Sequence, residues 1–204
     1  MMMVSSVTNI KITPIMIKFN ERHPVALKEL VPPTPDQYPT KFFKNASFRH
    51  VYENSNDYVR YVLDNVPIVG NHKRVLVDVK VHDLNEGDHP CIPGWHCDTA
   101  MNVNSSTLPE VHHLFVVGDN RTEFLAEPFE WNDSVVNQVT IASTIPEDIK
   151  TSIIPNATIC RFGRLDFHRG PKATSSCKRL LIRVSETGTA STNNNDFICN
   201  TFHK

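Results

Sequence analysis

Residues 75–82, Val-Leu-Val-Asp-Val-Lys-Val-His, decide the fold class of this chain. Valine occupies every second position, so all four valines would share one face of an extended strand. The positions between them carry leucine, aspartate, lysine and histidine. This alternation predicts a strand with a buried aliphatic face and a mixed outer face.

Five further segments after this strand are short and rich in Val, Ile, Thr and Phe, and turn residues separate them. They are residues 111–117, 122–126, 135–143, 157–167 and 178–185. Nothing between residues 74 and 185 has the period of a helix longer than one turn. The pattern predicts a mainly β protein whose core, residues 74–186, is an antiparallel sandwich or jelly roll.

The first 73 residues have a different character, because a Pro-rich stretch (residues 31–39) separates two apolar segments. We expect helices over Pro24–Leu30 and over Asp57–Asn65, the second capped by Asn56. They would flank and support the β core. Residues 187–204 begin with a run rich in Ser, Thr, Asn and Gly, which predicts a flexible tail. The whole chain, 1–204, is expected to form one domain.

The composition narrows the class of protein. The chain has 204 residues, of which 40% are hydrophobic, and 21 basic residues nearly balance 22 acidic ones. This hydrophobic content excludes disorder as the main state, and the charge balance argues against binding nucleic acid or lipid by charge alone. Five cysteines without repeated spacing do not resemble a disulfide framework. With no signal peptide or membrane span recognisable, we expect a soluble, reduced, cytoplasmic protein without a membrane partner.

The segment Lys178–Ser185 places unusual residues on one strand face. Arg179, Leu181, Arg183 and Ser185 alternate with Leu180, Ile182 and Val184, so two arginines and a serine lie opposite a clean aliphatic face. An inward arginine needs an anion, and a carboxylate is its best geometric match. The alternative is an edge strand whose arginines are solvated.

A second set of polar residues could bind a metal ion. His96 and Asp98 are two residues apart, so in an extended segment both side chains point to one side. His168 ends a later strand candidate. Two imidazoles and one carboxylate on a β scaffold are the ligands of non-haem Fe(II) oxygenases. Alone, the His-x-Asp pair is more often a surface histidine beside a turn aspartate.

In order and spacing, these motifs resemble the Fe(II)- and 2-oxoglutarate-dependent dioxygenases. The chain reads His96-x-Asp98, then 69 intervening residues, His168, Arg179 at +11 and Arg183-x-Ser185 at +15. The resemblance covers residues 74–185 and implies a double-stranded β-helix core of jelly-roll or cupin-like type.

The resemblance also implies roles. His96, Asp98 and His168 would bind Fe(II), and Arg183, helped by Ser185, would bind the 5-carboxylate of 2-oxoglutarate. Arg179 would be either the anchor itself or an arginine that faces the substrate. The implied reaction uses O2 to hydroxylate an unactivated C–H bond and releases succinate and CO2.

Several alternatives remain open at this stage. His113 and Arg121 are further candidates for substrate contact. His89, Cys91, His96 and Cys97 cluster in sequence as in a structural zinc site, although their spacing is not that of a zinc knuckle. The chain could also be a non-catalytic cupin-like or jelly-roll binding protein, or a structural β-sandwich. We favour a small metabolite as substrate; a protein side chain or a nucleobase also fits.

Overall fold

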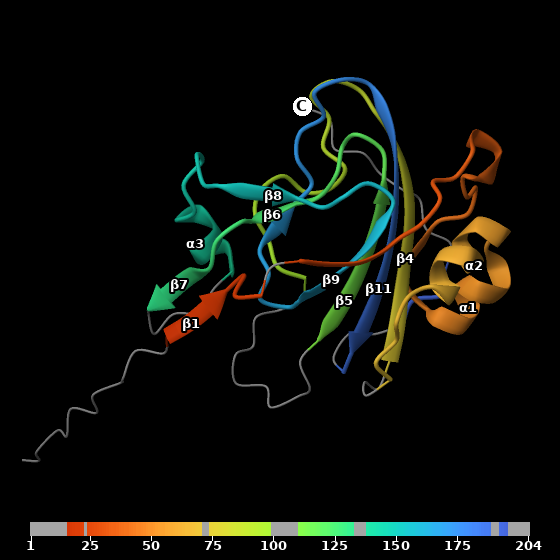
Figure 1. The fold of residues 1–204 in the computed structure, drawn as a ribbon, viewed down its shortest axis with the longest axis horizontal. Helices are drawn as coiled ribbons and strands as arrows, with labels where there is room; N and C mark the ends of the chain where they lie inside the picture. Colours follow the sequence, from red (N-terminus) through yellow and green to blue (C-terminus); the bar gives the residue numbers. More distant parts are fainter. Residues whose placement is uncertain are drawn as a thin grey trace, which may run out of the picture.

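The computed structural model describes residues 16–22, 24–70, 74–98, 110–132, 138–188 and 192–195, and is mainly β (Figure 1). Its helices are α1 (Phe48–Asn54), α2 (Asp57–Asp64), α3 (Gln138–Ser143) and the short 3-10 helix η1 (Pro35–Gln37). Its strands are β1 (Met16–Phe19), β2 (Val25–Glu29), β3 (Phe43–Ser47), β4 (Arg74–Leu84), β5 (Val111–Val117), β6 (Glu123–Leu125), β7 (Phe129–Asn132), β8 (Thr151–Ile153), β9 (Thr158–Gly163), β10 (His168–Arg169) and β11 (Cys177–Thr187).

A six-stranded antiparallel sheet of order β2-β9-β5-β11-β4-β3 forms the centre of the molecule. Helices α1 and α2 pack on one face of this sheet and bury their apolar sides against it (Figure 1). The aliphatic residues of β11 that were predicted to share a face, Leu180, Ile182 and Val184, lie in this cluster with Phe115 of β5. The predicted alternation of β11 is therefore confirmed.

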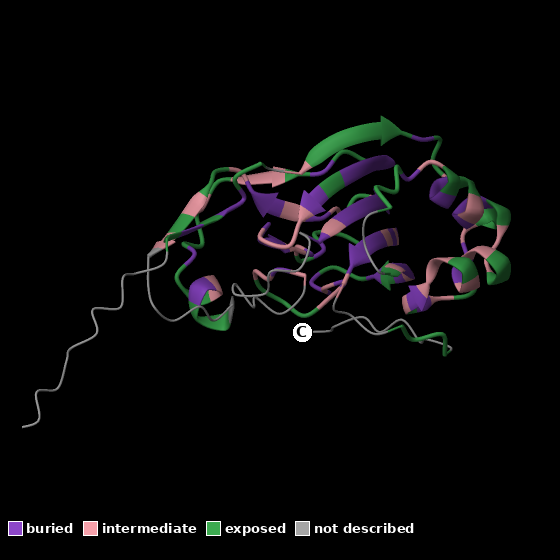
Figure 2. Ribbon diagram, turned by 90° about the horizontal axis from the view of Figure 1, so that it is seen from below, coloured by how far each residue is buried: buried purple, intermediate pink, exposed green. Residues whose placement is uncertain are grey.

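The other face of the large sheet packs against a small antiparallel sheet of order β10-β6-β8. Leu114 and Phe162 of the large sheet contact Phe124 of the small one in a second core. A backbone bridge between His96 and His168 joins the segment around residue 96 to the edge of the small sheet, next to β10. Figure 2 shows that the buried residues concentrate in these central strands, whereas the helices are buried on part of their surface only.

The polar positions of β4 do not face outward as predicted. Asp78 and His82 are each only 2% exposed, and Lys80 and His82 line a pocket between the two sheets. The prediction was wrong because the valine face of β4 is covered by α1 and α2, which directs the alternate face to the inside. Both faces of β4 are thus interior, and only one of them is apolar.

The helix predicted over Pro24–Leu30 is instead β2, an edge strand with every residue exposed. Its backbone pairs with β9, with a register shift between Ala26 and Lys28. Ala, Leu, Lys and Glu favour a helix, but so short a segment is only marginally stable as a helix, and the open edge of β9 offers backbone hydrogen bonds. Tertiary pairing therefore overrides local propensity.

The strand predicted over residues 135–143 was also wrong, since residues 138–143 form helix α3; residues 133–137 lie outside the described residues. Ile141 is fully buried and packs in one apolar cluster with Ile145. The hydroxyls of Ser143 and Thr144 donate to the carbonyl oxygens of Thr140 and Ile141, 2.7 and 2.8 Å away. These bonds satisfy two carbonyl oxygens at the end of the short helix, whose formation is favoured by the burial of Ile141 and Ile145.

The remaining findings concern α2, the cysteines and the residues after β11. The helix at residue 57 begins as predicted, with the Asn56 side chain accepting from the backbone N–H of Val59. The four described cysteines are free. Among the described helices, none has the length and apolar character needed to cross a membrane. Of the predicted tail, Thr187 belongs to β11, Asn193 and Asn194 hydrogen-bond to β3, and residues 189–191 and 196–204 lie outside the described residues.

Candidate metal centre and its pocket

A pocket of about 840 Å³ lies between the large and small sheets. His96, Asp98 and His168 line it together with Arg179 and Arg183 of β11. All five are candidate site residues from the sequence. The fold thus brings the His96-x-Asp98 motif next to the segment from His168 to Arg183, which lies some 70 to 90 residues later in the chain.

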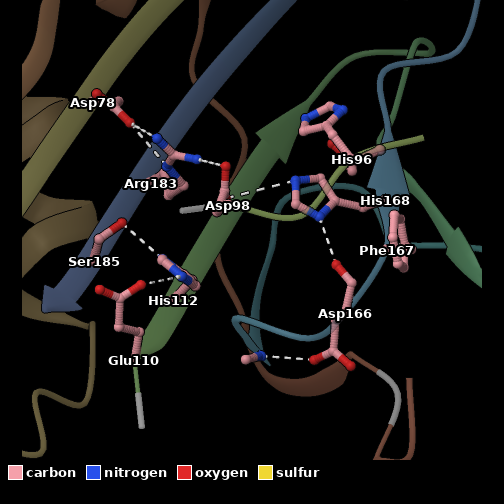
Figure 3. A network of polar contacts seen from close by, with 12 residues as sticks. Asp78, His96, Asp98, Glu110, His112, Asp166, Phe167, His168, Arg183 and Ser185 are labelled. Atoms are coloured by element: carbon pink, nitrogen blue, oxygen red, sulfur yellow. Dashed lines mark hydrogen bonds and ion pairs between the residues drawn. The ribbon is translucent and has the colours of Figure 1, made fainter. Parts of the chain in front are cut away.

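Three side chains in this pocket are close enough to bind one ion. One ligand atom from each of His96, Asp98 and His168 lies within 4.8 Å of the others (Figure 3), and no other group of three such residues meets this criterion in the described part of the chain. The Nε2 atom of His168 is 3.6 Å from the Asp98 Oδ2 atom. That Oδ2 atom is buried and has no hydrogen-bond partner. An orphaned carboxylate oxygen beside two imidazoles fits a divalent cation.

The fold orients both imidazoles for metal binding. His168 Nδ1 donates to the carbonyl oxygen of Asp166 at 2.9 Å, and His96 Nδ1 donates to that of Gly94 at 3.2 Å. A neutral imidazole that donates through Nδ1 presents a lone pair at Nε2. Burial lowers the pKa of His168 to about 4 although Asp98 opposes this effect, so the ring is neutral at neutral pH. The aromatic rings of Phe124 and Phe162 hold it in place.

Arg183 lies between two carboxylates. Its Nε atom donates to Asp78 Oδ2 at 2.8 Å, and its two terminal nitrogens form ion pairs with Asp78 and Asp98 (Figure 3). Burial alone would raise the pKa of Asp98, but the charge and hydrogen bond of Arg183, together with His168 and His112, outweigh it and hold that pKa well below its ordinary value. The anion that the inward Arg183 requires is thus supplied by the chain itself.

Ser185 does not contact Arg183 in this structure. Its hydroxyl is 2.9 Å from Nδ1 of His112, the residue opposite it on β5. The Nε2 atom of His112 is 4.0 Å from Glu110, whose carboxylate also accepts from Thr187. Burial lowers the pKa of His112, which keeps the ring neutral. The two residues of the Arg-x-Ser motif therefore have separate partners: Arg183 pairs with carboxylates, and Ser185 pairs with His112.

Arg179 occupies a separate position in the same pocket. It is 3% exposed, and its guanidinium donates to the Asn120 carbonyl oxygen at 2.8 Å and to Thr122 Oγ1 at 3.0 Å. It is four positions from Arg183 on the same strand face, or about 13 Å between the Cα atoms. The pocket wall thus carries one arginine beside the cluster and one farther along β11.

Two other candidates do not line this pocket. His113 follows His112 on β5 and therefore points to the opposite face of the sheet, where it interacts electrostatically with Glu186 and Arg161. Arg121 donates to the Ile154 carbonyl oxygen at 3.2 Å. The substrate contacts proposed for them from sequence are not supported.

A structural zinc site is not supported either. His89, Cys91 and Cys97 do not join His96 in any metal-binding group of the described residues. Cys97 is buried in an apolar cluster with Phe167, and burial raises the pKa of its thiol, which disfavours the thiolate that zinc would need.

Sequence reasoning missed Asp78, Lys80 and His82 as residues of the site. The alternation of residues 75–82 does indicate that these three side chains share one face of the strand, opposite an all-valine face. The alternation alone predicts an outward polar face, because the cover of helices over the valine face is a tertiary feature.

No model of a known protein family matches the chain, and no solved structure matches it. The assignment of this site therefore depends on its own geometry and chemistry.

Proposed function

We propose that the protein is an Fe(II)- and 2-oxoglutarate-dependent oxygenase that hydroxylates an unactivated C–H bond. The observation that carries this proposal is the convergence of His96, Asp98 and His168 on one wall of a pocket that also contains Arg179. When bound, the iron and 2-oxoglutarate would together activate O2 and release succinate and CO2.

The donor set fits Fe(II) and differs from that of a structural zinc site. Two neutral imidazoles and one carboxylate leave coordination positions for a chelating co-substrate, whereas structural zinc sites use four protein ligands. The backbone carbonyls of Asp166 and Gly94 fix the two rings, and such outer hydrogen bonds maintain ligand orientation. Asp98 would supply the carboxylate oxygen that has no other partner.

Arg179, rather than Arg183, is the better anchor for the 5-carboxylate of 2-oxoglutarate. Arg183 is paired with Asp78 and with the proposed ligand Asp98, so its guanidinium is already occupied by carboxylates of the chain. The 5-carboxylate lies at the far end of the molecule from the 2-oxo acid group that chelates a metal. An arginine farther along the same strand, fixed by Thr122 and the Asn120 carbonyl, suits that distance.

The order of the strands supports a double-stranded β-helix. From β4 onward the chain alternates between the large sheet (β4, β5, β9, β11) and the small one (the residue 96 segment, β6, β8, β10). Apart from β7, which pairs with β1 in a separate two-stranded sheet, it crosses after every strand except between β6 and β8, so the second half repeats the path of the first in reverse. Such a path is typical of a jelly roll built from two Greek keys, and it supports the proposed double-stranded β-helix.

An anaerobic titration of the metal-free protein with Fe(II) and 2-oxoglutarate tests this function. We expect a visible charge-transfer absorption in the wild type and none in His96→Ala. Arg179→Gln should raise the 2-oxoglutarate concentration for half-saturation by about 100-fold, the loss of a charge-assisted bidentate contact. The matched control is Arg161→Gln, an exposed arginine of β9 outside the pocket. Absence of the band in folded wild-type protein would refute the proposal.

One observation favours a second function, that of a non-catalytic binding protein of cupin-like or jelly-roll type. Arg183 has its charge balanced by Asp78 and Asp98 within the chain, which requires no co-substrate. A protein of this kind would bind a ligand in the pocket with an affinity that does not depend on Fe(II).

A further inference from the structure

We infer that Asn20 is a positioning residue of the metal centre, through which the packing of β1 and the binding of metal at His168 depend on each other. This inference rests on the metal centre of the proposed function, and it concerns how the chain holds that centre. Asn20 directly follows β1 and is fully buried. It contacts Phe167, the residue before His168, across 147 positions of the chain.

The side chain of Asn20 binds both backbone groups of Phe167. Its Oδ1 atom accepts from the Phe167 N–H at 3.0 Å, and its Nδ2 atom donates to the Phe167 carbonyl oxygen at 3.2 Å. The backbone N–H of Asn20 also donates to the carbonyl oxygen of Leu165, 3.2 Å away. A side-chain amide placed in this way makes the two bonds that a residue of a neighbouring strand would make. Asn20 thus takes the place of a strand partner just before β10.

Each of the two peptide groups that Asn20 holds also bonds to a metal-ligand residue. The first joins Asp166 to Phe167, and its carbonyl oxygen accepts from Nδ1 of His168 at 2.9 Å. The second joins Phe167 to His168, and its N–H donates to the carbonyl oxygen of His96 at 2.9 Å. Because a peptide group is planar and rigid, fixing one of its ends fixes the other. Asn20 therefore orients the His168 ring and the backbone bridge to His96 without touching either side chain.

The apolar residues of β1 support the same two segments from behind. Phe19 packs edge-on against Phe167, with their ring centroids 5.1 Å apart. Cys97, which lies between His96 and Asp98 in the chain, is buried in the same apolar cluster as Phe19 and Phe167. The ligand side chains thus line the pocket, whereas Cys97 and Phe167 beside them pack against β1. Asn20 adds directed hydrogen bonds to this contact, which apolar packing alone does not provide.

The packing of β1 and the binding of metal should therefore favour each other. An opening that separates Asn20 from Phe167 releases both peptide groups, and with them the orientation of His168. A metal ion held by His168 opposes this opening, and by reciprocity an intact Asn20 contact raises the affinity for metal. An asparagine that only stabilises the fold would leave the metal affinity of the folded protein unchanged.

An anaerobic titration of the metal-free protein with Co(II) tests the inference on the variant Asn20→Gly. Asn20 has a φ of 53°, which glycine adopts readily, so the substitution removes the side-chain bonds at little cost to the backbone. We expect the Co(II) dissociation constant to rise about tenfold, in the range found for residues that orient metal ligands. The visible absorption of the bound Co(II) should also change, because it depends on the geometry of the ligands.

Asn56→Gly is the matched control. The Asn56 side chain likewise accepts from a backbone N–H, that of Val59 at 3.0 Å, and donates to a backbone carbonyl oxygen, that of Gln37 at 2.8 Å. It caps α2, which packs on the other face of the large sheet. This variant should lose stability but keep the affinity and the absorption of bound Co(II). If Asn20→Gly behaves in the same way, Asn20 serves the fold alone and the inference is overturned.

Amide hydrogen exchange in the wild type is a second test that does not depend on the folding of a variant. At a free Zn(II) concentration about 100 times the dissociation constant, exchange of the Phe167 N–H measured by NMR should slow by about 100-fold, because the metal opposes the local opening. The Val59 N–H, bonded to Asn56 at the same distance of 3.0 Å, should exchange at an unchanged rate. Equal slowing of the two amides would overturn the inference.

The two proposals fail in different ways. A charge-transfer band with Fe(II) and 2-oxoglutarate, together with unchanged Co(II) binding in Asn20→Gly, would overturn the role of Asn20 alone. Weaker Co(II) binding in that variant without the band in the wild type would overturn the oxygenase and leave a metal centre positioned by Asn20. Folded wild-type protein that binds no Co(II) would overturn both.

Discussion

Arg183 forms an ion pair with Asp98, the carboxylate that completes the cluster with His96 and His168. The same guanidinium also pairs with Asp78, whose Oδ1 atom accepts from the backbone N–H of Asn45, so the candidate metal ligand Asp98 ends a series of alternating charges formed by Asp78, Arg183 and Asp98 (Figure 3). A metal ion at the cluster would share Asp98 with Arg183. The affinity for metal therefore depends on residues that do not contact it.

Replacing Asp78 by Asn should weaken metal binding. Without the charge of Asp78, Arg183 would interact more strongly with Asp98 and compete with the cation. We expect an Mn(II) dissociation constant about tenfold higher than in the wild type, in the range found for outer-shell partners. Calorimetric titration measures it. Asp83→Asn, on the same strand but exposed and paired with Lys178, is the control, and equal affinities in both variants would exclude this role of Asp78.

Metal binding should stabilise the fold. At a free Mn(II) concentration about 100 times the dissociation constant, the free energy of unfolding should rise by about 2.7 kcal/mol, and a chelator should reverse the increase. His96→Ala should abolish the increase, because it removes a partly exposed ligand at little cost to the core. His50→Gln, in α1 on the other side of the large sheet, should retain it. Urea unfolding with and without Mn(II) measures the effect; an increase that survives His96→Ala would place the metal elsewhere.

Acid should destabilise the protein through its buried histidines. Burial lowers the pKa of both His82 and His113 from 6.5 to about 4 in the folded state. Between these pH values the unfolded chain binds more protons than the folded one, so stability is lost as the pH falls from about 6.5 to about 4. Each group contributes at most about 1.4 kcal/mol per pH unit.

Urea unfolding at pH 7, 6 and 5 measures this dependence. His113→Gln should reduce the loss of stability between pH 7 and pH 5, since the variant has no group that titrates at this position. The comparison concerns the slope with pH and is independent of the cost of the substitution at pH 7. A slope equal to that of the wild type would contradict the assignment.

Gly118→Ala should disturb both stability and co-substrate binding. Gly118 has a φ of 120°, and a Cβ atom there would lie 2.4 Å from the Lys178 carbonyl oxygen and 3.4 Å from the Arg179 Cα atom. Backbone strain and this overlap together should cost about 3 kcal/mol of unfolding free energy. The added Cβ atom would push β11 away from Gly118, and this displacement should also weaken 2-oxoglutarate binding at Arg179.

Gly70→Ala is the matched control for this variant. Gly70 also has a positive φ, 79°, but a Cβ atom there would meet nothing within 4 Å. We expect a loss of about 1 kcal/mol, from backbone strain alone, and unchanged 2-oxoglutarate binding. Equal losses in the two variants would show that the contact with Lys178 has no energetic effect.

Local patterns were sufficient to predict several elements. The alternation of Leu180, Ile182 and Val184 with Arg179 and Arg183 was correct because a strand directs successive side chains to opposite faces wherever it lies. The start of α2 was correct because Asn56 caps it within the same short segment. Spacing along the chain also brought out His96, Asp98 and His168, which the structure brings together.

Local patterns failed where a distant segment decided the outcome. Residues 25–29 have helical propensity, but pairing with β9, more than 125 residues away, makes them a strand. Residues 138–143 look like a strand, but burial of Ile141 beside Ile145 makes them a helix. In both cases the free energy of tertiary contacts exceeds the small differences in local preference.

The sequence by itself determined which residue types could meet: a His-x-Asp pair, a later histidine, and a strand with two arginines on one face. Only the tertiary structure decided what each arginine contacts. Arg183 is 105 residues from Asp78 in the chain, and no periodicity relates the two. The pairing arises because β4 and β11 are neighbours in the large sheet and the helices cover the valine face of β4, which leaves Asp78 to face the pocket side, opposite Arg183.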